Sequence, residues 1–433
     1  MLKIDQHAMD AMPDTRQQRL RAWLTNVKYY LGLIVLLALG ALTSPHAADG
    51  SNIFLSSANF SDVFRQVANV GVMSVGMTLV IITAGIDLSV GSVMGFGSVL
   101  TAILLTTPGS NAASWTSLAL DAVSVFAIVY AAGGMFARRM GGAKVTAGTA
   151  GVGGKASGKW HRAVRVALAA LAALLACGVV WHRLPQKVSL PMVLWMVPLA
   201  GLAIGALNGL IITRGRMQPF IVTLAAMVGM MGVARLVAGQ DTAVYSIYSG
   251  SNATTDIDNL RALLFGVVPV PALFFIVIAL IADFVLNRTV FGKYLYAIGG
   301  NEKCARISGL NVDRHKIAAY AISGMLAALV GVLYAAQYRQ GKADAGVGWE
   351  LDAIAAVVIG GTSLMGGVGR IAGTVAGVLI FGFLGNILLL NNIDSNTQLV
   401  LKGLIIVVAV FLQQTRMNPQ TMLVRLRGRR AAR

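Results

Sequence analysis

The amino-acid sequence predicts an all-α polytopic membrane protein. Of its 433 residues, 56% are hydrophobic and only 12% are charged, and the mean hydropathy is +0.73. Soluble domains carry about 25% charged residues, so a soluble chain of this composition would lack a charged surface. The apolar residues also gather in runs of about 20, the length that crosses a bilayer as a helix. A membrane barrel would instead show short alternating segments.

Twelve apolar segments are expected to span the membrane. The first run, 31–43, is followed by small residues and resembles a signal peptide. The preceding segment, 1–28, is long for such a peptide and contains three aspartates, so we expect an uncleaved first helix, with cleavage as the alternative. The expected spans lie near residues 29–44, 62–84, 87–106, 117–137, 163–182, 190–213, 217–238, 263–286, 316–337, 353–369, 371–390 and 398–415.

The distribution of basic residues predicts that both termini are cytoplasmic. With that orientation, 27 of the 35 lysines and arginines fall on the cytoplasmic side and six in outer loops, while Arg235 and Lys402 lie within spans and can snorkel. The chain then divides into a cytoplasmic segment 1–28, a transmembrane domain 29–415 and a basic tail 416–433. The net charge of +18 does not indicate nucleic-acid binding, because the basic residues are spread over loops beside lipid headgroups.

The sequence predicts no nucleotide, metal or catalytic site. The basic loop 138–162 contains TAGVGGKAS, which resembles a phosphate-binding loop. However, Thr149 stands where a glycine is required, and Ala156 stands where Ser or Thr is required. We therefore expect no cofactor in this chain. Five scattered histidines and two isolated cysteines, Cys177 and Cys304, form neither a catalytic cluster nor a metal or disulfide site.

Glycines at four-residue spacing predict close contact between helices. Two such series occur, at Gly201, Gly205 and Gly209, and at Gly369, Gly373 and Gly377. This spacing places bare backbone on one face of a helix, where a neighbouring helix can approach.

Two breaks in the apolar pattern could line a path for a polar solute. The first contains Asp87, in ITAGIDLSVGSVMG, and is either an unwound or re-entrant segment or a tight turn at the membrane edge with Asp87 as a helix cap. The second, 353–374, is rich in glycine, and its uncharged polar residues suit a neutral polyhydroxylated solute; helix packing is the alternative. The candidate path residues are Asp87, Ser89, Asn208, Gln218, Thr362, Ser363 and Asn386.

One densely charged stretch, 296–320, lies between two apolar segments on the predicted cytoplasmic side. Asn301 is expected to cap a short helix, and Gly309 to end it. The helix is too short and too charged to span a bilayer. By itself, the pattern fits an anchor to lipid headgroups and a docking helix for another protein equally well.

Four passages together resemble the monosaccharide permeases of bacterial ABC importers, the ribose, xylose and galactose group. These passages are GIDLSVGSVMG (85–95), GALNGLIITRGRMQPFIVTLAAM (205–227), FGKYLYAIGGNEKCARISGLNV (291–312) and ELDAIAAVVIGGTSLMGGVGRIAGT (350–374). The resemblance implies a non-catalytic subunit in the bacterial inner membrane, with about ten core spans of the cobalamin-importer-like fold. About two further spans and the basic loop, roughly 108–189, would be an insertion into that plan.

The resemblance also implies partners and a role for the charged stretch. A second permease subunit, here expected to be an identical chain, completes the pathway. Cytoplasmic ATPases, which bind the ATP and magnesium, power it, and a periplasmic binding protein delivers the sugar. The short helix corresponds to the family's ATPase-coupling helix, with the matching residues Gly300, Asn301, Glu302, Ala305, Arg306, Ser308 and Gly309.

Two further expectations concern the outer loops and the energy source. The acidic residues of the outer loops are expected to dock on basic patches of the binding protein. The alternative function is a secondary transporter that is driven by a proton or sodium gradient through Asp87. The acidic loop residues are Asp241, Asp256, Asp258, Asp344 and Glu350.

Overall fold

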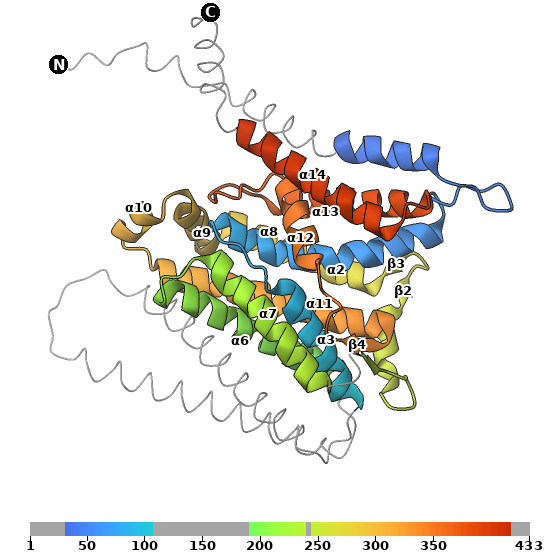
Figure 1. Ribbon diagram of the computed structural model, residues 1–433, viewed down its shortest axis with the longest axis horizontal. Helices are drawn as coiled ribbons and strands as arrows, with labels where there is room; N and C mark the ends of the chain where they lie inside the picture. The colour runs from blue at the N-terminus through green and yellow to red at the C-terminus, as the bar shows by residue number, and fades with distance from the viewer. Residues whose placement is uncertain (1–30, 107–189, 240–243, 417–433) are drawn as a thin grey trace, which may run out of the picture.

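The described part of the protein is a bundle of α-helices with a few very short strands (Figure 1). The computed structural model describes residues 31–106, 190–239 and 244–416. The predicted spans near 117–137 and 163–182 lie outside these residues, as do the loop 138–162, the segment 1–28 and the tail beyond residue 416.

Six described helices are long and apolar enough to cross a membrane. They are α2 (Ser57–Ile82), α6 (Leu190–Arg214), α7 (Pro219–Ala238), α8 (Val270–Arg288), α11 (Val312–Tyr338) and α13 (Ile371–Leu390). Three shorter apolar helical stretches accompany them: Leu31–Thr43, α3 (Val90–Thr106) and the first part of α14 (Ser395–Arg416). These helices agree with the prediction of a polytopic, mainly helical membrane protein.

The remaining elements are short. They are α9 (Val290–Gly300), α10 (Glu302–Ile307), α12 (Trp349–Ile359) and a 3-10 helix (Thr255–Arg261), with the strands β1 (Val244–Ser246), β2 (Leu263–Leu264), β3 (Val268–Pro269) and β4 (Gln340–Lys342). Strand β1 pairs antiparallel with β4, and β2 with β3. Helix α10 lies at one end of the bundle, here called the α10 end, and the strands lie at the opposite end (Figure 1).

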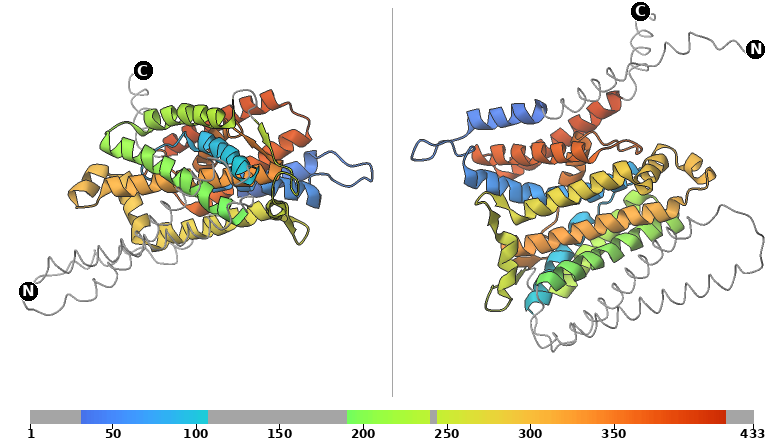
Figure 2. Two further views of the ribbon diagram at one scale, coloured as in Figure 1. Left: turned by 90° about the horizontal axis from the view of Figure 1, so that it is seen from below. Right: turned by 180° about the vertical axis from the view of Figure 1, so that it is seen from behind.

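Helices α2 and α11 form the centre of the bundle. Both are largely buried, and α11 packs along α6, as the view from behind shows (Figure 2). Helices α7 and α8 are mostly exposed, and their exposed side chains are apolar, including Leu236, Val228, Leu280 and Phe284. Such a surface matches lipid rather than water, because exposed apolar area of this extent is unfavourable in water.

The predicted glycine contacts are confirmed. A Cβ atom on Gly205 would lie 2.1 Å from the backbone oxygen of Tyr320, so α6 and α11 touch through main-chain atoms. On α13, a Cβ atom on Gly377 would lie 2.0 Å from the backbone oxygen of Ala356 in α12. Each close approach requires glycine, as the four-residue spacing predicted.

The predicted span near 353–369 is only partly helical. Helix α12 ends at Ile359, and the next helix begins at Ile371. Between them, Gly361, Gly366 and Gly367 adopt positive φ angles of 87°, 83° and 73°, which interrupt any helix. The segment is therefore a half-length helix followed by a folded loop, as the glycine-rich pattern of the second break indicated.

Candidate functional site

Helix α10 is a single short helix held between α9 and α11. The Asn301 side chain accepts a hydrogen bond from the backbone N–H of Cys304 at 3.0 Å, and Gly309 ends the segment at φ +82°. Both local predictions are confirmed. The inner face of α10 carries Ala305, which is buried with Ile298 and Val312. This small apolar cluster fixes α10 against its two neighbours.

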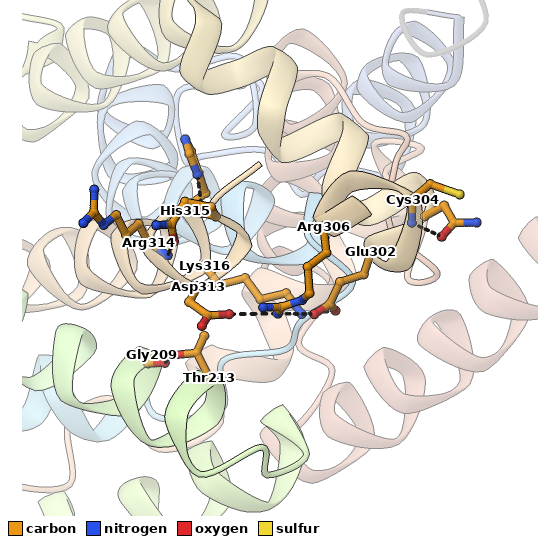
Figure 3. Close-up of polar contacts among 11 residues, drawn as sticks. Gly209, Thr213, Glu302, Cys304, Arg306, Asp313, Arg314, His315 and Lys316 are labelled. Carbon is orange, nitrogen blue, oxygen red and sulfur yellow. Dashed lines mark hydrogen bonds and ion pairs between the residues drawn. The ribbon is translucent and has the colours of Figure 1, made fainter. Parts of the chain in front are cut away.

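Ion pairs join α10 to the first turns of α11 (Figure 3). Glu302 accepts hydrogen bonds from Arg306 at 3.2 Å and from Lys316 at 2.7 Å, and Arg306 also donates to Asp313 at 2.8 Å. Partial burial acts to raise the pKa of Glu302, but the hydrogen bonds and charges of Lys316 and Arg306 outweigh it, so its pKa lies below the ordinary value. The hydrogen bonds to Asp313 and Glu302 raise the pKa of Arg306. Glu302 and Arg306 thus position α10 on α11.

The outer face of α10 carries an exposed apolar side chain that the sequence reasoning did not single out. Ile307 is 86% exposed, and Lys303 and Cys304 are exposed beside it. The hydroxyl of Ser308 donates a hydrogen bond to the backbone oxygen of Cys304, four residues earlier in the chain, at 2.9 Å. An isoleucine that projects from a charged, six-residue helix is suited to insertion into an apolar hollow on another protein.

Helix α9, which leads into α10, contacts both predicted breaks. A Cβ atom on Gly299 would lie 1.8 Å from the backbone oxygen of Ile82, where α2 ends, and 2.5 Å from the backbone nitrogen of Gly367. Gly367 in turn donates a hydrogen bond to the Ile82 oxygen at 2.9 Å. Tyr296 donates its hydroxyl to the Gly369 oxygen at 2.8 Å. A displacement of α10 would therefore reach both breaks through adjoining main-chain atoms.

The first break brings three predicted path residues together. Asp87 is fully buried between α2 and α3 and accepts hydrogen bonds from the Ser89 hydroxyl at 2.6 Å and from Ser323 of α11 at 2.8 Å. Asn208 of α6 donates to the Ser89 hydroxyl at 3.0 Å. Ser323 lies well inside the long helix α11, so Asp87 sits within the bundle in this conformation. Among the described residues, the side chains and backbone that donate to Asp87 are all neutral, so Asp87 is held by hydrogen bonds rather than by an ion pair.

The second break contains Thr362 and Ser363, both buried. The backbone N–H of Ser363 donates to the Val368 oxygen at 2.9 Å, and that of Met365 donates to the Ser363 hydroxyl at 3.2 Å. The loop thus satisfies much of its backbone internally, which non-helical chain at membrane depth requires.

The two remaining path candidates lie at opposite ends of the bundle. Asn386 exchanges side-chain hydrogen bonds with Asn59, near the start of α2 and away from α10. Gln218 is exposed at the start of α7, at the α10 end. The structure therefore does not bring all seven candidates into one place.

Further polar pairs cross the bundle from α2 and were missed from the sequence. Asn69 donates to Gln337 of α11 at 3.1 Å, and the Thr78 and Thr374 hydroxyls lie 2.7 Å apart. The polar residues Asn69 and Thr78, which interrupt a mainly apolar part of α2, were the sequence feature that could have indicated these pairs. Their partners come from distant parts of the chain and could not be assigned without the fold.

Two charged residues have surroundings that the sequence did not reveal. Lys402 pairs with Asp352 at 2.9 Å and lies 5.3 Å from the ring centre of Phe381. Glu350 is only 8% exposed and packs against Gly91, so the prediction that it docks a partner is wrong. Asp241 lies outside the described residues.

These features define a class of protein. Long apolar spans, breaks that lie inside the bundle and a short exposed helix between two longer ones are typical of a polytopic membrane permease. The chain belongs to the family described as the permease component of the branched-chain amino acid transport system, which it matches over residues 161–410. The family resemblance predicted from the sequence is confirmed.

Individual relatives support this assignment. The chain is 34% identical to the ribose import permease protein RbsC of Escherichia coli (strain K12), over 90% of this chain and 94% of that protein. It is 33% identical to RbsC of Bacillus subtilis (strain 168), over 89% and 91%. It is 32% identical to the xylose transport system permease protein XylH of Escherichia coli (strain K12), over 89% and 92%. No solved structure matches the chain.

Proposed function

We propose that this chain is the transmembrane permease subunit of an ATP-driven ABC importer that translocates a monosaccharide or a related polyol. The relatives that import ribose and xylose support the substrate class. The hydroxyl and amide groups inside the bundle suit a neutral polyhydroxylated solute. The observation that carries the proposal is helix α10, which exposes Ile307 outward and contacts both breaks through α9.

The family to which the chain belongs supports the following proposed assembly. Two copies of the chain form the pathway in the bacterial inner membrane, with both termini in the cytoplasm and about ten core spans plus two from the insertion 108–189. Cytoplasmic ATPases bind ATP and magnesium and dock on α10, while a periplasmic binding protein delivers the sugar. This chain itself needs no cofactor.

The proposed mechanism uses the contacts of α10 as a mechanical connection. Closure of the ATPases on ATP displaces α10, and α9 transmits the displacement through Gly299 to Ile82 and Gly367. The breaks then shift, and the path opens alternately to each side of the membrane. The ATPases and the binding protein thereby bias one two-state equilibrium from opposite faces. In this mechanism Asp87, Ser89, Asn208, Thr362 and Ser363 change their exposure to the path.

The variant Ile307→Glu tests the proposal. A carboxylate in place of the exposed isoleucine should prevent α10 from docking in an apolar hollow, because burying an unpaired charge is strongly unfavourable. In proteoliposomes with the ATPase and the sugar-loaded binding protein, we expect loss of both stimulated ATP hydrolysis and sugar uptake. Ile307→Leu, the matched control, should retain both. Stimulated hydrolysis and uptake that persist in Ile307→Glu would show that α10 does not couple the two proteins.

The same proteoliposomes distinguish the secondary transporter. An ABC importer should take up sugar with ATP inside the vesicle and show no uptake when only a proton or sodium gradient is imposed. Gradient-driven uptake that needs no ATP and is abolished by Asp87→Asn would overturn the proposal in favour of the alternative.

A further inference from the structure

A cleft at the α10 end is lined by charged side chains from three elements. It has a volume of about 650 Å³ and lies between the turn that joins α6 to α7, helix α10 and the first turns of α11. Small-molecule sites commonly enclose about 300–1,000 Å³, so the cleft is large enough for one such ligand. Its charged lining residues are Arg214, Arg216, Glu302, Arg306, Asp313 and Lys316.

The charges in the cleft do not balance. Four side chains are cationic and two are acidic, which leaves a formal charge of +2. Both carboxylates are already occupied, since Glu302 pairs with Arg306 and Lys316, and Asp313 pairs with Arg306. Arg214 and Arg216 form no ion pair with any residue that the structure describes, although both line the cleft. The excess positive charge therefore resides on these two arginines.

The two unpaired guanidinium groups point to the chemistry of a ligand. A guanidinium donates two parallel N–H bonds to a carboxylate or phosphate, and these charge-assisted bonds are among the strongest in proteins. A phosphate group has enough terminal oxygens to accept bonds from both arginines at once. The beginning of α7, at Gln218 and Pro219, forms one wall of the cleft and adds the positive end of a helix dipole.

We propose that this cleft binds a phosphate group through Arg214 and Arg216. The group belongs either to a small phosphorylated molecule in solution or to the headgroup of an anionic phospholipid, because both present the same oxygens. Ile307, the exposed residue of the proposed docking face, does not line the cleft, although Glu302 and Arg306 of the same helix do. Phosphate binding can therefore be tested without measuring transport.

Occupancy of the cleft would alter how α10 is held. Lys316 and Arg306 line the same cleft and hold Glu302, so a bound phosphate competes with Glu302 for these cations. Binding would loosen the ion pairs between α10 and α11. The ligand would thereby regulate the position of α10 from within this chain.

Binding of inorganic phosphate to the purified full-length chain tests the proposal. In dodecyl maltoside, which carries no phosphate, titration calorimetry should detect saturable binding. Arg214→Gln with Arg216→Gln should weaken it by at least about tenfold, because two charge-assisted contacts are lost. Arg288→Gln, which removes an exposed arginine at the end of α8 outside the cleft, should leave the affinity unchanged. Thermal unfolding of each variant verifies that it is folded.

Nanodiscs distinguish the two sources of phosphate. If the headgroup is the ligand, discs of phosphatidylglycerol should suppress phosphate binding relative to discs of an uncharged galactolipid. If a soluble molecule is the ligand, phosphate should bind in both. No saturable binding in detergent, or equal binding by the parent chain and the double variant, would overturn the proposal. A double variant that only impairs assembly with the ATPase, while phosphate does not bind, would also overturn it and make the cleft a protein interface.

Discussion

Glu302 connects two helices through a single carboxylate. One of its oxygens accepts from Arg306 within α10, and the other accepts from Lys316 on α11. Exposed ion pairs of this kind each contribute only about 0.2–1 kcal/mol. Because α10 has six residues and little buried area of its own, even contributions of this size affect how tightly it is held.

The connection should depend on pH. Since the pKa of Glu302 is lowered when it is paired, the stabilisation is present above the ordinary glutamate value of 4.5 and is lost as pH falls through the lower, paired value. A nitroxide attached to the exposed Cys304 in a Cys177→Ser background reports the mobility of α10. We expect its spectrum to show faster motion as pH falls from neutral to below 4.5.

The matched control for this experiment is Glu302→Gln. This side chain cannot ionise, so the label should be mobile at neutral pH and change little on acidification. An identical pH response in the parent and the glutamine variant would show that another group controls α10.

At the scale of helices, main-chain contacts at glycines accompany side-chain packing in the bundle. Gly205 of α6 meets Tyr320 of α11, and Gly377 of α13 meets Ala356 of α12. In lipid, such close approach contributes dispersion energy that the hydrophobic effect between helices cannot supply. The ion pair between Lys402 of α14 and Asp352 of α12 adds a polar link from α12 to one further helix.

Alanine at Gly205 tests the importance of this contact. The added Cβ atom would lie 2.1 Å from the Tyr320 oxygen, so α6 and α11 must move apart. Overpacking of this kind costs about 1–3 kcal/mol, and we expect a lower midpoint of thermal unfolding in detergent.

Gly229→Ala on α7 is the matched control for Gly205→Ala. No atom lies within 4 Å of a Cβ atom at Gly229, and alanine is the better helix former, so the midpoint should stay the same or rise. Equal destabilisation by both variants would show that the α6–α11 contact has no special role.

At the scale of the molecule, the distribution of basic residues predicts an orientation in the membrane that can be tested. If α10 faces the cytoplasm, the strands at the other end face the periplasm. A green fluorescent protein fused after Arg433 should fluoresce, and alkaline phosphatase inserted in the loop between α7 and α8 should be active. Active phosphatase at the C-terminus would contradict the predicted orientation.

Much of the fold could be predicted because composition and helix length are local properties. Asn301 and Gly309 mark the limits of α10 for the same reason, since capping depends on neighbouring residues. The contact of Asp87 with Ser323 could not be predicted, because the two residues are 236 positions apart in the sequence. The pairing of Lys402 with Asp352 was missed because a lone lysine in an apolar run does not reveal which helix packs against it.

The joint at Gly299, Ile82 and Gly367 is built from main-chain atoms. Every amino acid presents the same carbonyl and, except proline, the same N–H, so the joint tolerates exchange of the surrounding side chains. A side chain at Gly299 would block it, because there is no room for a Cβ atom, and Gly367 is also restricted by its positive φ of 73° and its close approach to Gly300. Side chains elsewhere in the two breaks can therefore be exchanged while this main-chain joint between α9, the end of α2 and the second break stays the same.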